Sequence, residues 1–288
     1  MTPNLRFSLS AWTAIVPGKN DTSAWTTWAN GNGVPLWTPD APPPPPAAAG
    51  RLPMMLARRM DAGSRFAVQA GLALMESHDV NAIVFSSRHG ELERMTRNLL
   101  RLAPRDEFSP ADFTASVHNA AAGQLTIIAK KTVPVSSVAA CEDSFHQALF
   151  EVGAFLAGGC ERVLLVDFEN EIPAVYRRHM AHFFPAPYAA AFIIQRGGDL
   201  CCSPVAHERD DGVGGGAGDD VGDGGGAGAG PDEAGSIPPS LAFLRGWLRG
   251  ESGFRIRSES CDWRWENRSR SSACLPPASS PDARLTPA

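Results

Sequence analysis

The chain has 288 residues, 43% of them hydrophobic and 20% charged, so it can bury the core of one domain with appendages. Its formal net charge of -5 gives no reason to expect a nucleic-acid partner. No apolar run approaches the roughly 18 to 20 residues of a membrane span, and the amino terminus lacks the basic and apolar regions of a signal peptide. Six cysteines without metal-ligand spacing favour a reducing compartment. We therefore expect a cytoplasmic protein that needs no metal or other cofactor.

The first predicted strand covers Phe7 to Val16. Apolar and polar residues alternate along it, and it ends in β-branched residues. The stretch from Trp25 to Pro46 carries three tryptophans and then the proline run Pro42–Pro46. A proline run is extended and cannot pair in a sheet. We expect an inserted surface loop here, with a docking motif for a proline-binding module as the alternative.

A helix, a buried strand and a second helix are expected next, over Arg65–Glu76, Asn81–Phe85 and Glu91–Leu102. The loop between the strand and the second helix carries Arg88 and His89. Open α/β sheets bind ligands at the carboxyl ends of their strands, so both are candidate ligand-binding residues. A solvated loop is the other interpretation.

A helix of small residues is predicted from Ala120 to Ala129, which suits close packing against a sheet or against a partner helix. A shorter helix, capped by Ser109 and Pro110, comes before it. His118 stands just ahead of the small-residue helix and is a candidate catalytic residue. A histidine that only hydrogen-bonds near the helix start is the alternative.

The stretch from Thr132 to Glu169 predicts a strand, a tight turn, a helix from Asp143 to Leu156, and a buried strand that ends at Asp167. Two strands joined by one helix favour a right-handed crossover in a parallel sheet. The turn places Cys141 at the first turn of the helix.

A cysteine at that position lies near unpaired backbone N–H groups and the positive end of the helix dipole, which stabilise a thiolate nucleophile. The acidic neighbours Glu142 and Asp143 oppose this, because negative charge beside a thiol raises its pKa. The alternative is that Cys141 is one more small, buried apolar residue.

The carboxyl-terminal third changes in composition. Ala189–Gln195 is predicted to be the final strand, and a Gly/Ala/Asp tract follows from His207 to Gly235. Leu241–Leu248 is one more amphipathic helix, and Arg255–Arg270 is a basic segment with two tryptophans that could bind acidic partners but is expected to be a frayed tail. We expect a folded domain over residues 1–196, a linker over 197–236, and a short helix with a largely disordered tail over 237–288.

The segment from Ser137 to Glu169 resembles the nucleophile region of the β-ketoacyl synthases. In that family a strand and a small-residue turn present a cysteine at the head of a buried helix, as Cys141 stands here, with Ser144 and His146 at the matching spacing. The preceding stretch, Ser116 to Ile127, is similar to the helix before the nucleophile strand. The order of elements is similar to the amino-terminal half of the thiolase-like fold.

The resemblance implies an α/β protein with a layered thiolase-like half-fold, in which helices cover a mixed sheet and a Gly-rich C-terminal extension is disordered. Residues 1–196 would be the β-ketoacyl synthase-like N-terminal domain, with Cys141 at the nucleophile position. The group that matches is the stand-alone N-terminal domain proteins found with aryl polyene and related type II fatty-acid or polyketide pathways.

The sequence also departs from active synthases. A condensing enzyme has a second half that supplies two catalytic histidines, one in an HGTGT-like loop, and no such motif follows Gln195. Glu142 and Asp143 stand where active synthases favour small or uncharged residues, and the stand-alone group often has glycine at the place of Cys141.

The leading hypothesis is therefore a non-catalytic accessory protein. It would pair with a complete β-ketoacyl synthase, or with itself, and shape the acyl tunnel as chain-length factors do. Thiolase-like folds dimerise through the strand and helix near the nucleophile, and Ala120–Ala129 suits such an interface.

The second hypothesis is an acyltransferase in which Cys141 accepts an acyl group from acyl carrier protein or coenzyme A, helped by His118 or His146. On a helix His146 would point about 140° away from Cys141, which disfavours its help. A third hypothesis is a binding module whose tryptophan-rich and proline-rich segments recruit other proteins.

Overall fold

The computed structural model describes residues 4–19, 21–31, 34–42, 52–103, 109–177, 179–180, 183–207 and 237–268. The proline run from residue 43 onward, most of the predicted linker and residues 269–288 lie outside these ranges, so what the sequence predicts for them stays a prediction. Within the described ranges, no helix is both long and apolar enough to cross a membrane.

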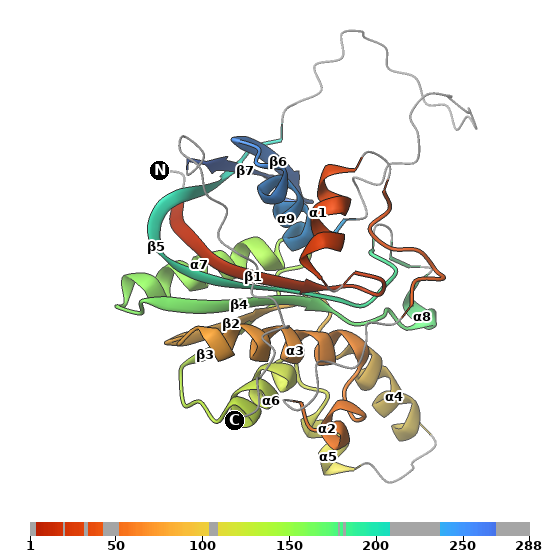
Figure 1. Cartoon of the computed structure of the whole chain (residues 1–288). Coiled ribbons are helices and arrows are strands. Elements are labelled where there is room, and N and C mark those ends of the chain that lie inside the picture. The colour runs from red at the N-terminus through yellow and green to blue at the C-terminus, as the bar shows by residue number, and fades with distance from the viewer. Residues whose placement is uncertain are drawn as a thin grey trace, which may run out of the picture.

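A mixed seven-stranded sheet forms the centre of the molecule (Figure 1). Its order is β3-β2-β4-β5-β7-β6, and β1 pairs with β5 beside that path. β3 and β4 flank β2 and run parallel to it, as the predicted crossover requires, while the other pairings are antiparallel. The strands are β1 Leu5–Ile15, β2 Ala82–Ser86, β3 Val135–Val138, β4 Arg162–Glu169, β5 Tyr188–Val205, β6 Gly253–Arg257 and β7 Asp262–Asn267.

Helices cover both faces of this sheet, with α3 and α6 on one side and α1, α7 and α9 on the other (Figure 1). Ile83 of β2 and Leu164 of β4 point into the α3–α6 core, while their neighbours Val84 and Leu165 point into the other. Strands buried on both faces read as continuous apolar runs, which explains why β2 and β4 are easily predicted. The helices are α1 Thr22–Asn30, α2 Met54–Ala57, α3 Ala62–Ser77, α4 Leu92–Leu102, α5 Pro110–Thr114, α6 Ala120–Ala129, α7 Ser144–Ala157, α8 Ala174–Arg177 and α9 Pro239–Arg249.

The surface loop predicted for the tryptophan-rich stretch is wrong for its first part, which is helix α1. The side chain of Asp21 caps this helix by accepting a hydrogen bond from the backbone N–H of Ala24 at 2.8 Å. Trp25 and Trp28 are three residues apart, so they share one face of the helix. Both are buried, and the indole of Trp25 donates to the carbonyl of Ala14 in β1 at 2.9 Å. These tryptophans are core residues.

The carboxyl-terminal prediction also needs correction. β5 continues to Val205, so the boundary expected at residue 196 falls inside a strand, and β7 pairs with that continuation. The segment predicted as a frayed basic tail contains the hairpin of β6 and β7. Trp263 and Trp265 alternate with polar residues along β7 and are buried in the core on the α7 side. Alternation of this kind is typical of a strand with one buried face.

Replacing Trp265 with alanine tests whether this hairpin is part of the core. We expect Trp265→Ala to lower the free energy of unfolding by about 3–5 kcal/mol, because it removes a fully buried aromatic side chain. Urea denaturation measures the change. The exposed neighbour Arg264→Ala is the matched control and should change stability by no more than about 0.5 kcal/mol. Equal small effects of both variants would show that the hairpin does not contribute to the cooperative core.

Candidate functional site

The turn between β3 and α7 holds Cys141 in an unusual backbone conformation. Its φ angle is 51°, in the left-handed region that residues with a Cβ rarely adopt. The hydroxyl of Ser144 accepts a hydrogen bond from the N–H of Ala140 at 2.9 Å and donates to the carbonyl of Cys141 at 2.7 Å. The turn is thus closed by the first residue of α7. Cys141 lies exposed at the head of the helix, so the alternative that it is a buried core residue is wrong.

The two acidic neighbours of Cys141 are each engaged by another group. The Glu142 carboxylate pairs with the Arg88 guanidinium at 3.2 Å. Asp143 accepts a hydrogen bond from the Trp263 indole at 2.6 Å and another from Ser260. Burial raises the pKa of Asp143, but these hydrogen bonds outweigh it and lower the pKa overall. The charge of Asp143 is therefore directed to the β6–β7 hairpin, and that of Glu142 is balanced by an arginine.

The loop after β2 is bound to the end of β4 through Glu169. One carboxylate oxygen of Glu169 accepts from the Ser87 hydroxyl at 3.1 Å and from the backbone N–H of Arg88. The other accepts from the N–H of His89 at 3.2 Å and lies 3.1 Å from its Nδ1 atom. The loop that carries Arg88 and His89 is thus held by a carboxylate of the same chain, and its predicted ligand binding stays a prediction.

His118 bridges two strands rather than contacting Cys141. Its Nε2 atom lies 3.0 Å from the carbonyl oxygen of Ser87, and its Nδ1 lies 2.8 Å from the hydroxyl of Ser137. A carbonyl only accepts, so Nε2 carries a proton and donates it to Ser87, while Nδ1 shares a hydrogen bond with the Ser137 hydroxyl. Both ring nitrogens are thus used to connect the start of α6 with β2 and β3. A catalytic role for His118 would require one of these bonds to break.

His146 lies on the buried face of α7, whereas Cys141 is exposed at the head of that helix. Its ring stacks on Trp263 with centroids 4.4 Å apart, and its Nε2 accepts a hydrogen bond from the Trp265 indole at 3.3 Å. Burial lowers the pKa of His146 to about 3, so the ring is neutral at physiological pH. This agrees with the helical geometry that disfavours its help to Cys141.

Two buried carboxyl groups near the strand ends are not predicted as site residues by the sequence. Asp167 accepts hydrogen bonds from Ser86 and Ser240, both at 2.5 Å, and from Tyr188 at 3.0 Å; burial raises its pKa to about 6. Glu91 accepts from Ser64 at 2.5 Å, and burial raises its pKa to about 7. The burial of both depends on helices distant in sequence, so no local signal could have identified them.

Residues 25–266 match the family model of the β-ketoacyl synthase N-terminal domain. The chain belongs to this family. The resemblance and the thiolase-like α/β fold that it implied are confirmed. No functionally curated protein matches the sequence.

Three solved structures illustrate the range of similarity. One chain from the complex of the ketosynthase ApeO with its chain length factor ApeC, from Xenorhabdus doucetiae, is 38% identical with a TM-score of 0.77, and the match covers 91% of this chain and 100% of that one. The ishigamide ketosynthase/chain length factor is 16% identical with a TM-score of 0.52, covering 73% and 69%. A β-ketoacyl synthase from Burkholderia phymatum STM815 is 14% identical with a TM-score of 0.50, covering 72% and 66%. The last two show the shared fold alone.

Replacing Cys141 with glycine tests the turn geometry. We expect Cys141→Gly to raise the free energy of unfolding by about 1 kcal/mol relative to Cys141→Ala, because alanine keeps the strain of the left-handed conformation and glycine does not. Both variants lose the thiol, so the pair isolates the backbone effect. Chemical denaturation of the two measures it. A glycine variant that is no more stable than the alanine variant would contradict the conformation of this turn.

Proposed function

We propose that this chain is a β-ketoacyl synthase-like accessory protein of type II fatty-acid or polyketide biosynthesis of the aryl polyene kind. It pairs with a complete ketosynthase and does not itself carry out condensation. The observation that carries the proposal is the match, at 38% identity over 91% of this chain, to a chain from a complex of a ketosynthase with its chain length factor.

Exposed apolar residues on β3 and on the helix before it suit such a partner. Among the described residues β3 pairs only with β2, which leaves its other edge open. Val135 of β3 is 40% exposed and Ile127 of α6 is 68% exposed. An open strand edge flanked by exposed apolar residues favours pairing with another chain. We assign this surface, Ile127 with the edge of β3, to the ketosynthase contact. A second copy of this chain is the competing occupant.

The surroundings of Cys141 support a non-condensing role. Decarboxylative condensation needs separate donors that stabilise the enolate and the oxyanion. Both nitrogens of His118 bond to Ser137 and Ser87, and His146 is buried against the tryptophans. Neither histidine is hydrogen-bonded to Cys141 in the described part of the chain.

Acylation of Cys141 is the second candidate function, and the exposure of its thiol at the head of α7 favours it. In that case the thiolate would attack the thioester of an acyl carrier protein or coenzyme A, forming an acyl-cysteine and releasing the carrier thiol.

Interface variants test the pairing. We expect the wild-type chain to co-purify with its cognate ketosynthase on size exclusion, and Ile127→Asp with Val135→Asp to abolish the complex, because two charges would be buried against the partner. Val175→Asp is the matched control, since Val175 is exposed on α8 at the other side of the view in Figure 1. A stable homodimer that excludes the ketosynthase would refute the heterodimer, as would a complex unaffected by the double variant.

Intact-mass spectrometry separates the two candidate functions. We expect no mass increase when the chain is incubated with acyl and malonyl thioesters, alone or with the ketosynthase, and an altered product length when the ketosynthase works in its presence. Cys141→Ala should change neither result. An acyl adduct found on the wild type and missing from Cys141→Ala would establish an acyl-accepting enzyme and reject the purely structural role.

A further inference from the structure

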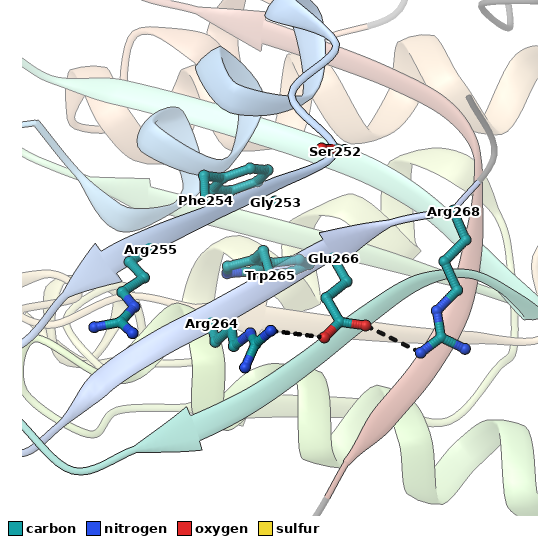
Figure 2. Close-up of a pocket in the computed structure, with 8 residues that line it drawn as sticks. All are labelled: Ser252, Gly253, Phe254, Arg255, Arg264, Trp265, Glu266 and Arg268. Atoms are coloured by element: carbon teal, nitrogen blue, oxygen red, sulfur yellow. Dashed lines mark hydrogen bonds and ion pairs between the residues drawn. The ribbon is translucent and has the colours of Figure 1, made fainter. Parts of the chain in front are cut away.

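Helix α4 is attached to the rest of the protein mainly through polar groups. A surface helix usually turns an apolar stripe toward the core. The β6–β7 hairpin attaches in that apolar way, and Figure 2 shows the ring of its buried Trp265 stacked against Phe254. In α4, by contrast, the buried residues are the polar Thr96 and Asn98. Four of its apolar side chains are 43% to 68% exposed, namely Met95, Leu99, Leu100 and Leu102.

The start of α4 is held by a buried network around Glu91, which is 5% exposed. The hydroxyl of Ser64, on α3, donates to one carboxyl oxygen of Glu91 at 2.5 Å. The side-chain amide of Asn170, just after β4, donates to the Ser64 hydroxyl at 2.8 Å and to the carbonyl of Gly90 at 3.0 Å. Its nitrogen also lies 3.5 Å from the other oxygen of Glu91. Three segments of the chain therefore meet at one buried carboxyl group.

The charged groups that face Glu91 leave it without a cation of its own. Arg94 and Arg97, on the same helix, attract a negative charge on Glu91, but their ion pairs are with Asp61 at the start of α3, at 3.9 and 2.6 Å. Asp61 repels such a charge. On the β4 side the facing group is the uncharged amide of Asn170. A carboxyl removed from water without a paired cation favours its protonated form.

This burial couples the attachment of α4 to pH. Burial raises the pKa of Glu91 to about 7, whereas exposure to water would restore its ordinary value of 4.5. Between these two values the attached helix keeps the proton and a detached helix loses it. The free energy that favours attachment is therefore largest at low pH. It falls as the pH rises from 4.5 to about 7 and stays low above that range.

We propose that ionisation of Glu91 releases the start of α4 from α3, so that this helix opens locally at alkaline pH while the sheet stays folded. Local opening of α4 exposes little additional apolar surface, because its larger apolar side chains are already exposed. The inference goes beyond the proposed function and does not depend on it, since neither the edge of β3 nor Cys141 takes part.

Hydrogen exchange of the full chain, followed by mass spectrometry, tests the proposal. Exchange rates of the backbone amides in Met95–Leu102 are measured at pH 5.0 and pH 8.0 and divided by the intrinsic rate at each pH. We expect the open fraction of α4 to rise at least about tenfold between the two pH values, while that of α6 stays constant. Glu91→Gln should remove the rise, because a glutamine side chain does not ionise in this range.

Glu161→Gln is the matched control, because Glu161 is exposed at the opposite end of β4 from Asn170. It should keep the wild-type rise. Equal opening of wild-type α4 at both pH values, a rise that persists in Glu91→Gln, or an equal rise in α6 would overturn the proposal. If Glu91→Gln misfolds by circular dichroism, carbon-13 NMR titration of the Glu91 carboxyl in the wild type decides: a midpoint near 7 supports the proposal and one near 4.5 rejects it.

Discussion

The burial of Trp263 and Trp265 against α7 is the constraint on which the rest of the molecule depends. Trp263 stacks on His146 and donates to Asp143, and the indole of Trp265 donates to His146. These contacts attach the last hairpin of the sheet to the helix that begins at the Cys141 turn. Two indole N–H groups in a dry core need acceptors, and a neutral histidine and a carboxylate at the start of α7 supply them. Hairpin, helix and turn are therefore fixed together.

This attachment helps to explain why the polar groups next to Cys141 are already paired. Asp143 is directed to the hairpin, Ser144 closes the turn, and Arg88 balances Glu142. The polar groups around Cys141 bond to one another, and no base among the described residues is hydrogen-bonded to its thiol. An active nucleophile site would keep at least one such group available to a substrate. Mutual pairing of these groups agrees with the accessory role that we propose, in which the chain acts on a ketosynthase by its shape.

Local patterns were enough to predict the parallel half of the sheet and its helices, and long-range burial decided the rest. β2 and β4 are continuous apolar runs because helices cover both of their faces. α6 covers Ala120–Ala129, the bounds that its run of small and apolar residues predicts. In contrast, α1 was obscured by the neighbouring prolines, and β7 by its arginines, although Trp25 and Trp28 lie at helical spacing and Trp263 and Trp265 alternate. The elements that bury these tryptophans lie far away in sequence. The exposure of Cys141 and the burial of Glu91 likewise follow from tertiary packing, which no local pattern contains.

The sheet order separates the edge of β3, which we assign to the ketosynthase, from the β6–β7 hairpin. β3 and β6 stand at opposite ends of the path β3-β2-β4-β5-β7-β6, so a chain that pairs along β3 extends the sheet away from the β6–β7 hairpin. Charged residues on an edge strand protect it against unwanted pairing, and that function alone could account for Arg255 on β6. It does not account for Arg264, which lies on β7 between β5 and β6 and has no open edge to protect. Arg264 is instead balanced in part by Glu266, which lies 3.4 Å away on the same strand (Figure 2).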